Sequence, residues 1–280
     1  MFSERFKSAN FLNSGRNCLG CIVEHLEIKE IHIPFYICSV VWQTLRGKNV
    51  KIKFYHIDTN FLPTKNFGEN DFILYPDYFG FCSKQSDFLA KKYKNLISDN
   101  ALSFFAKPKG IASFYSPRKF FNVNDGGILL LDNFNSDGFE TAKDRNFEIK
   151  DYNSFYQNEL FIDKDSVKKM SEQTFSALKN IDFETEKTKR QKLFKKFTVL
   201  LNGINDLKID ISDADVPYKY PLLNPQNTNF ANFLDKNEIY LIKYGSKLPE
   251  DFPEHDISNN LALLPLNERT LELTKQFFSK

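Results

Sequence analysis

The first half of the chain alternates short apolar runs with helical or loop segments. Apolar residues recur at helical spacing in residues 17–26, before the first of these runs. Residues 40–47, between the first two runs, suggest a second helix that Gly47 ends. The runs with strand composition lie at 31–34, 51–58, 71–78, 94–99, 111–116 and 127–131. Apolar strands that alternate with helices are typical of a mainly parallel sheet covered on both faces. The sequence therefore predicts an α/β fold.

The pattern changes near residue 150. Residues 165–178 and 186–202 have apolar side chains at helical spacing, and the second stretch carries Lys, Arg and Glu on its other side. Strand-like pieces follow at 207–211, 216–222, 238–243 and 261–264, interleaved with helical stretches near 230–234 and 270–278. We therefore expect a large domain over residues 1–160, then linking helices and a small α+β domain over residues 161–280.

Composition and charge exclude several classes of protein. The chain has 280 residues, of which 41% are hydrophobic and 26% charged, which is typical of a globular protein. Its net charge is only +2, and the charges are interspersed, so we expect no nucleic-acid partner. No apolar run is long enough to span a membrane, and the first residues lack the apolar core of a signal peptide. A cytoplasmic protein without a membrane partner is the expectation.

Two cysteines, Cys18 and Cys21, have the spacing of a zinc or redox site. A zinc site needs a second such pair, and the sequence has none. Both cysteines fall in the helix expected over residues 17–26, where we interpret them as small buried hydrophobic residues. No histidine pair has metal-ligand spacing either, so no metal is expected.

The strongest candidates for chemistry follow two apolar runs. Asp99 ends the run 94–99, and Lys119 closes the sequence Ser116-Pro-Arg-Lys directly after the run 111–116. A carboxylate, a hydroxyl and a lysine in this order suit a pyridoxal 5'-phosphate (PLP) site. The lysine would bind the cofactor covalently, the serine would hold its phosphate, and the aspartate would pair with the pyridinium nitrogen. An Arg-Lys pair alone is usually a solvated surface feature, so the order and spacing carry this prediction.

Read in order, the chain resembles the DegT/DnrJ/StrS family of PLP-dependent sugar aminotransferases, which have the fold type I (aspartate aminotransferase-like) scaffold. Residues 12–19 resemble the family's Ser-Gly-(Thr/Arg)-x-Ala-Leu segment, and residues 96–101 resemble its strand ending in the pyridinium-binding aspartate. Residues 112–127 are similar to a branch with Ser-x-Arg-Lys followed by Asp-Gly-Gly. Weaker similarities continue to about residue 277, so the resemblance covers nearly the whole chain.

The resemblance implies a cofactor, a reaction and an assembly. It implies PLP as cofactor, a large mixed sheet that binds it, and transfer of an amino group from a donor, expected to be glutamate, to a keto-sugar. The acceptor would be nucleotide-linked and used for surface polysaccharide or a related glycan, and the protein would be a homodimer with shared sites. Lys119 and Asp99 would be catalytic. The cofactor-binding residues would be Ser14, Gly15, Arg16, Asp99, Ser103, Ser116 and Lys119.

The chain also departs from the family's pattern. Leu102 stands three residues after Asp99, where the family has His or Gln, and Ser103 is the candidate polar replacement. The histidine that usually precedes Gly80 is replaced within residues 77–79, and the chain is shorter than typical members. These departures leave an alternative open, in which the chain is a catalytically degenerate relative that acts as a binding or scaffold protein.

Overall fold

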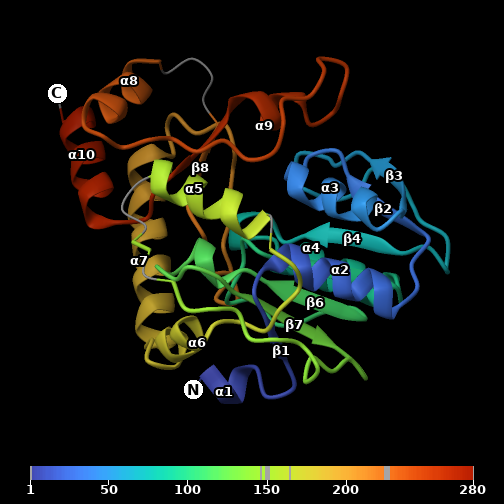
Figure 1. Ribbon diagram of the computed structural model, residues 1–280. Helices are drawn as coiled ribbons and strands as arrows, with labels where there is room; N and C mark the ends of the chain where they lie inside the picture. The colour runs from blue at the N-terminus through green and yellow to red at the C-terminus, as the bar shows by residue number, and fades with distance from the viewer. Residues whose placement is uncertain (1, 146, 149–151, 164, 224–227, 280) are drawn as a thin grey trace.

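The computed structural model describes residues 2–145, 147–148, 152–163, 165–223 and 228–279. A seven-stranded sheet lies between layers of helices, and a two-stranded sheet with its own helices packs beside it (Figure 1). No described helix combines the length and the apolar composition needed to cross a membrane. The expected mainly parallel sheet with helices on both faces is confirmed.

The large sheet has the strand order β1-β7-β6-β5-β4-β2-β3. Neighbouring strands from β2 to β6 pair in parallel, whereas β7 is antiparallel to both β6 and β1. The carboxyl ends of β4, β5 and β6 therefore meet at one edge, where ligands of open α/β sheets commonly bind. The strands are β1 Asn10–Leu12, β2 Glu30–Pro34, β3 Lys51–Tyr55, β4 Ile73–Pro76, β5 Leu96–Asn100, β6 Ala112–Tyr115 and β7 Gly127–Leu131.

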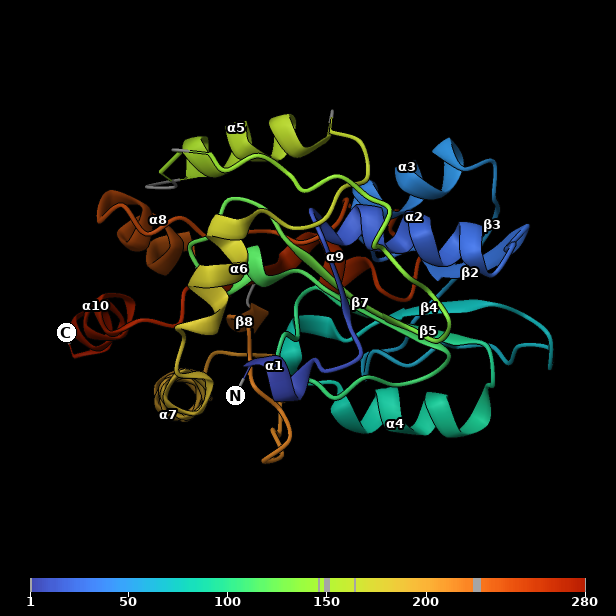
Figure 2. The same cartoon turned by 60° about the horizontal axis from the view of Figure 1, so that its bottom comes forward.

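Helices cover the large sheet from both sides. Helices α2 (Gly15–His25) and α3 (Ser39–Gly47) lie on one face and α4 (Ser83–Lys92) on the other (Figure 2). Leu19 and Ile22 of α2 are fully buried in one apolar cluster with Ile97 of β5, and each such side chain contributes about 1.5–3 kcal/mol. This packing fixes where α2 begins relative to the ends of the central strands.

The second half of the chain builds the smaller unit. Strands β8 (Tyr220–Leu223) and β9 (Leu261–Leu264) pair antiparallel and pack with the long helix α7 (Phe183–Leu201). The other described helices are α1 Phe2–Arg5, α5 Tyr152–Asp163, α6 Glu172–Lys179, α8 Thr228–Lys236, α9 His255–Asn260 and α10 Glu268–Phe278. The helix expected over 186–202 and the strand expected over 261–264 are both present.

Parts of the second half differ from the expectation. The helix expected over 165–178 begins only at Glu172, because Ser171 caps it. The residues before Ser171 run beside β1 instead, and the Lys168 carbonyl accepts the N–H of Asn13 at 2.9 Å. Residues 207–211 form no strand, and the stretch expected at 238–243 contributes only a bridge between Ile242 and Leu263. Their apolar side chains still pack into the core, so their composition indicated burial rather than strand pairing.

Gly127 is a position where the fold depends on the absence of a side chain. A Cβ there would lie 2.3 Å from the backbone oxygen of Ser14, which accepts the N–H of Cys18 in the first turn of α2. We predict that Gly127→Ala lowers the free energy of unfolding by about 1–3 kcal/mol in urea denaturation. Gly138→Ala is the control, because a Cβ there meets nothing within 4 Å. Equal stability of the two variants would show that the approach of α2 to β7 does not require glycine.

Candidate active site

Asp99 lies near the carboxyl end of β5 with its side chain buried. Ile97, two residues earlier, packs against α2, and side chains alternate along a strand, so Asp99 faces the α2 side of the sheet. Its Oδ1 accepts the backbone N–H of Ala101 at 2.9 Å. Burial raises the pKa of the Asp99 carboxyl to about 6, although the Ala101 N–H and the Lys119 ammonium both act to lower it.

Lys119 ends the short 3-10 turn η2 (Pro117–Lys119) that follows β6. Its backbone N–H donates to the carbonyl of Ser116 at 3.2 Å, which closes the turn. Burial lowers the pKa of the Lys119 ammonium, and the Glu159 carboxylate opposes this effect. The positive charge of Lys119 also acts to lower the pKa of Asp99, which requires the two side chains to lie near each other. The structure therefore brings together the two residues predicted to be catalytic. A lysine with a lowered pKa is suited to nucleophilic and proton-transfer chemistry.

The start of α2 lies against the strand end that carries Ser116. Ser14 caps the helix, and its Oγ accepts the N–H of Asn17 at 3.2 Å. A Cβ on Gly15 would lie 3.6 Å from the Cβ of Ser116, so the first turn of α2 and Ser116 are direct neighbours. The first N–H groups of a helix have no partner within the helix and favour an anion. The predicted residues Ser14, Gly15 and Ser116 thus border one position suited to an anion.

Two arginines near this position share one carboxylate from α5. Arg16 Nη2 donates to Glu159 Oε2 at 2.8 Å, and Arg118 Nη1 donates to Glu159 Oε1. Burial acts to raise the pKa of Glu159, but Arg118, Lys119 and Arg16 outweigh it, and the pKa is lowered. The sequence predicted Arg16 only. Arg118 was seen within the Ser-x-Arg-Lys motif, whereas nothing in the sequence indicated that Glu159 would reach it.

Lys219, just before β8, is a second lysine of this site that the sequence analysis missed. Burial, together with the positive charges of Lys119 and Arg190, lowers the pKa of its ammonium to about 8. The electrostatic effect of Lys119 places the two lysines near each other, although they lie in different halves of the chain. The sequence analysis interpreted residues 216–222 only as strand-like and gave this lysine no role.

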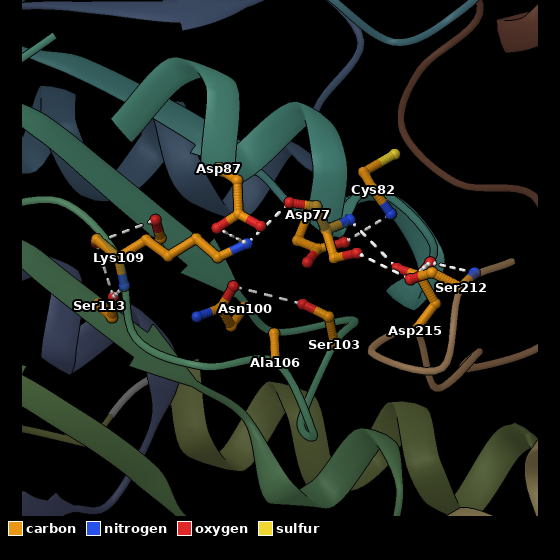
Figure 3. Close-up of polar contacts among 12 residues, drawn as sticks. Asp77, Cys82, Asp87, Asn100, Ser103, Ala106, Lys109, Ser113, Ser212 and Asp215 are labelled. Carbon is orange, nitrogen blue, oxygen red and sulfur yellow. Dashed lines mark hydrogen bonds and ion pairs between the residues drawn. The ribbon is translucent and has the colours of Figure 1, made fainter. Parts of the chain in front are cut away.

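Ser103 lies in a different polar cluster. Its hydroxyl donates to Asn100 Oδ1 at 3.3 Å, and it also lowers the pKa of Asp77 by hydrogen bonding (Figure 3). Asn100 follows Asp99 in β5 and therefore points to the opposite face of the sheet. These contacts give no support to a cofactor role for Ser103, which stays a prediction. Leu102 is buried within an apolar cluster.

The polar cluster around Asp77 joins the two halves of the chain. Asp77 Oδ1 accepts the N–H of Cys82 at 3.1 Å, and burial raises the pKa of this carboxyl to about 7. Asp215 accepts the N–H of Ser83 at 3.1 Å and the hydroxyl of Ser212 at 2.7 Å (Figure 3). These bonds tie the segment before Lys219 to α4, so the cluster helps to position that lysine.

The cysteines and the other titratable groups indicate no further centre. Cys18 and Cys21 are buried on α2, and burial raises the pKa of both thiols, that of Cys21 to about 11. Among the residues that the structure describes, no three His, Cys, Asp or Glu side chains gather closely enough to hold a metal ion.

Comparison with known proteins identifies the fold. No protein-family model matches the sequence, and no curated protein matches it. Solved structures do match. The DegT DnrJ EryC1 StrS aminotransferase from Brucella abortus is 12% identical with a TM-score of 0.64, over 99% of this chain and 88% of that one. DesV of S. venezuelae, solved in complex with a ketimine intermediate, is 13% identical with a TM-score of 0.67, over 100% and 87%.

A third similar structure is Helicobacter pylori PseC, an aminotransferase involved in the biosynthesis of pseudoaminic acid. It is 16% identical to this chain with a TM-score of 0.64, and the match covers 99% of this chain and 88% of PseC. At such identities the likeness establishes the fold. The expected aspartate aminotransferase-like scaffold, with its small C-terminal unit, is therefore confirmed.

The raised pKa of Asp99 predicts that this residue destabilises the folded protein. A shift from 3.8 to about 6 costs about 3 kcal/mol at neutral pH. Between these values the folded state binds the proton more tightly than the unfolded state, so the cost is absent below about pH 4 and complete above about pH 6. Asp99→Asn should therefore be more stable than the wild type at pH 7.5 in urea denaturation, with a smaller gain at pH 5.

Asp182→Asn provides the control for this prediction. Asp182 is an exposed helix cap whose pKa is lowered by hydrogen bonds from Thr185, so its removal should bring no gain at pH 7.5. If Asp99→Asn were less stable than the wild type at pH 7.5, the charge of Asp99 would be stabilised by its surroundings and the account of its burial would be wrong.

Proposed function

We propose that this protein is a PLP-dependent aminotransferase of the DegT/DnrJ/StrS type. The observation that carries the proposal is that Lys119 lies near enough to buried Asp99 to lower the pKa of its carboxyl, beside the start of α2. The fold adds support, since the similar structures include sugar aminotransferases. A purely structural domain has little use for a lysine with a lowered pKa, a buried carboxylate and an anion-favouring helix start at one place.

The residues present fit PLP. Lys119 would bind the cofactor covalently, and Asp99 would hold its ring nitrogen. The first turn of α2 and Ser116 would hold its phosphate, because helix N-terminal N–H groups and hydroxyls are common phosphate ligands. The close contact of Gly15 with Ser116 lets these two groups act on one anion. The positive charges of Arg16 and Arg118 lie close together near the start of α2, where they would favour a negatively charged phosphate.

The chemistry divides between the cofactor and the chain. When bound, PLP supplies an electron sink for negative charge that develops on the reacting carbon. The Asp99 carboxylate would keep a proton on the ring nitrogen. The Lys119 amine would take the proton that leaves the α-carbon of the amino donor and hold it for return. Its lowered pKa favours this role, because it makes the neutral amine more accessible than in a solvated lysine.

We propose glutamate as amino donor and a nucleotide-linked keto-sugar as acceptor, for the synthesis of a surface polysaccharide or related glycan. Both substrates are anionic. Positive charge from Arg16, Arg118 and Lys219 lies near Lys119 and would attract them. Buried Leu102 favours the alternative of a degenerate relative that binds without catalysing, because an apolar group replaces a polar one beside Asp99.

Lys119 is the residue to test for the covalent link. We expect PLP added to the purified protein, followed by borohydride, to leave a pyridoxyl label on Lys119 that peptide mass spectrometry locates. Lys219 is the strongest competitor, because its pKa is lowered to about 8 and it lies nearby. The label should therefore persist on Lys119 in Lys219→Met and disappear in Lys119→Met. A label on Lys219 or elsewhere, or none, would contradict the assignment and favour the degenerate relative.

We also propose that the protein is a homodimer that uses α5 as part of its interface. This helix exposes Tyr156, Leu160 and Phe161 by 49%, 39% and 50%, and these are among the large apolar side chains most exposed on the described chain. Stable dimers commonly bury upwards of ~2,000 Å², with apolar groups at the centre. A second copy seated on α5 would lie beside the candidate active site, because Glu159 of the same helix contacts Arg16 and Arg118.

Light scattering at low protein concentration tests the assembly. We expect a dimer for the wild type and dissociation in Phe161→Glu, since a charge at the centre of an apolar interface is costly. Phe88→Glu is the matched control, because Phe88 on α4 is equally exposed, at 51%, but lies on the opposite side of the sheet. A monomeric wild type, or equal effects of the two substitutions, would contradict the role of α5.

A further inference from the structure

The ammonium of Lys219 has no acidic partner. The side chain is half-buried just before β8, and its Nζ lies 5.3 Å from the centre of the Tyr218 ring. Within the part of the chain that the structure describes, no carboxylate forms an ion pair or a hydrogen bond with it. The charges that lower its pKa, those of Lys119 and Arg190, are both positive. A half-buried cation in such surroundings is costly unless an anion pairs with it.

The acidic residues close to the two lysines serve other cations. Glu186 pairs with Arg190 at 2.8 Å, and the Glu159 carboxylate opposes the fall in the pKa of Lys119. Among the described residues, no carboxylate acts on the pKa of Lys219 in this way. The place beside Lys119 therefore suits an anion that a ligand brings.

Arg190 of α7 fixes Lys219 beside Lys119. Its Nη2 donates to the carbonyl of Phe120 at 3.2 Å, and its Nη1 donates to the carbonyl of Tyr218 at 3.0 Å. Phe120 directly follows Lys119 and Tyr218 directly precedes Lys219, and the two rings lie 5.3 Å apart. One guanidinium group thus joins the backbone next to each lysine, although the two segments belong to different halves of the chain.

We propose that Lys219 binds the α-carboxylate of the amino donor, so that the site accepts amino acids and rejects simple amines. The inference deepens the proposed function and rests on it for the reaction at the α-carbon. An ammonium group is a compact point charge, which suits a single carboxylate. The bond would also give the half-buried cation the negative partner that the chain itself does not provide.

The position of Lys219 beside Lys119 favours the α-carboxylate over the other anionic groups of the substrates. Lys119 would take its proton from the α-carbon, and the α-carboxylate is bonded directly to that carbon. The side-chain carboxylate of glutamate and the phosphates of a nucleotide-linked acceptor lie farther along those molecules. A cation next to Lys119 is therefore placed to meet the α-carboxylate.

Calorimetric titration of the full-length, cofactor-free protein with two ligands tests the proposal. L-Glutamate and 4-aminobutyrate share an amine and a distal carboxylate, but only glutamate carries the α-carboxylate. We expect the wild type to bind glutamate about tenfold more tightly than 4-aminobutyrate, and Lys219→Met to lose this difference. Lys84→Met is the matched control, because Lys84 is exposed on α4 at the opposite face of the sheet, and it should keep the difference.

Three results would overturn the proposal: equal binding of the two ligands by the wild type, no measurable binding of glutamate, or a difference that survives in Lys219→Met. Uridine diphosphate is titrated in the same way. A loss of affinity in Lys219→Met that is confined to this nucleotide would assign the lysine to the acceptor, and would also overturn the proposal.

Lys219→Arg tests the charge separately, and it keeps the proposal testable if Lys219→Met fails to fold. Because the pKa of Lys219 is lowered to about 8, the wild type should lose its preference for glutamate as the pH rises from 7 to 9. A guanidinium stays protonated over this range, so Lys219→Arg should keep the preference at pH 9. The same pH dependence in both proteins would contradict a role for the ammonium charge.

The titrations use protein without cofactor, so their outcome does not depend on a link between PLP and Lys119. A PLP label on Lys119, together with an unchanged preference in Lys219→Met, would leave the proposed function and remove this inference. Absence of the label, together with loss of the preference, would remove the proposed function and leave a carboxylate-binding site at Lys219.

Discussion

The site depends on two groups of opposite charge at one end of the sheet, the buried carboxylate of Asp99 and the half-buried ammonium of Lys119. Burial disfavours each charge by itself, which is why the pKa of Asp99 rises and that of Lys119 falls. Perturbed groups of this kind cluster at functional sites, where the protein gives up stability for chemistry.

The rest of the architecture serves to bring those two residues to one edge. Parallel pairing of β4, β5 and β6 places their carboxyl ends together. The register sets Asp99 opposite Phe114, and Lys119 ends the short turn that follows β6. The apolar face of α2 then fixes the start of that helix against Ser116. Segments from the second half of the chain close the site with Glu159 and Lys219, so neither half forms it alone.

The sequence predicted what local patterns encode. The apolar runs of the first half gave every strand from β2 to β7, and the strand ends gave Asp99, Ser116 and Lys119. It missed what depends on distant contacts. Glu159 lies on a helix without a clear apolar stripe, and Lys219 precedes a strand pattern like any surface lysine. Both acquire their surroundings only when α5 and β8 pack beside Lys119. Residues 165–170 failed as a helix because pairing with β1 outweighs their helical spacing.

A crystal structure of the protein grown with PLP tests the central claim most directly. The account predicts electron density continuous from Lys119 Nζ, with Asp99 at one end and the first turn of α2 at the other. Density at another lysine, or a pocket that stays empty in protein saturated with PLP, would contradict it. In the second case the buried pair would be a structural feature of a binding protein.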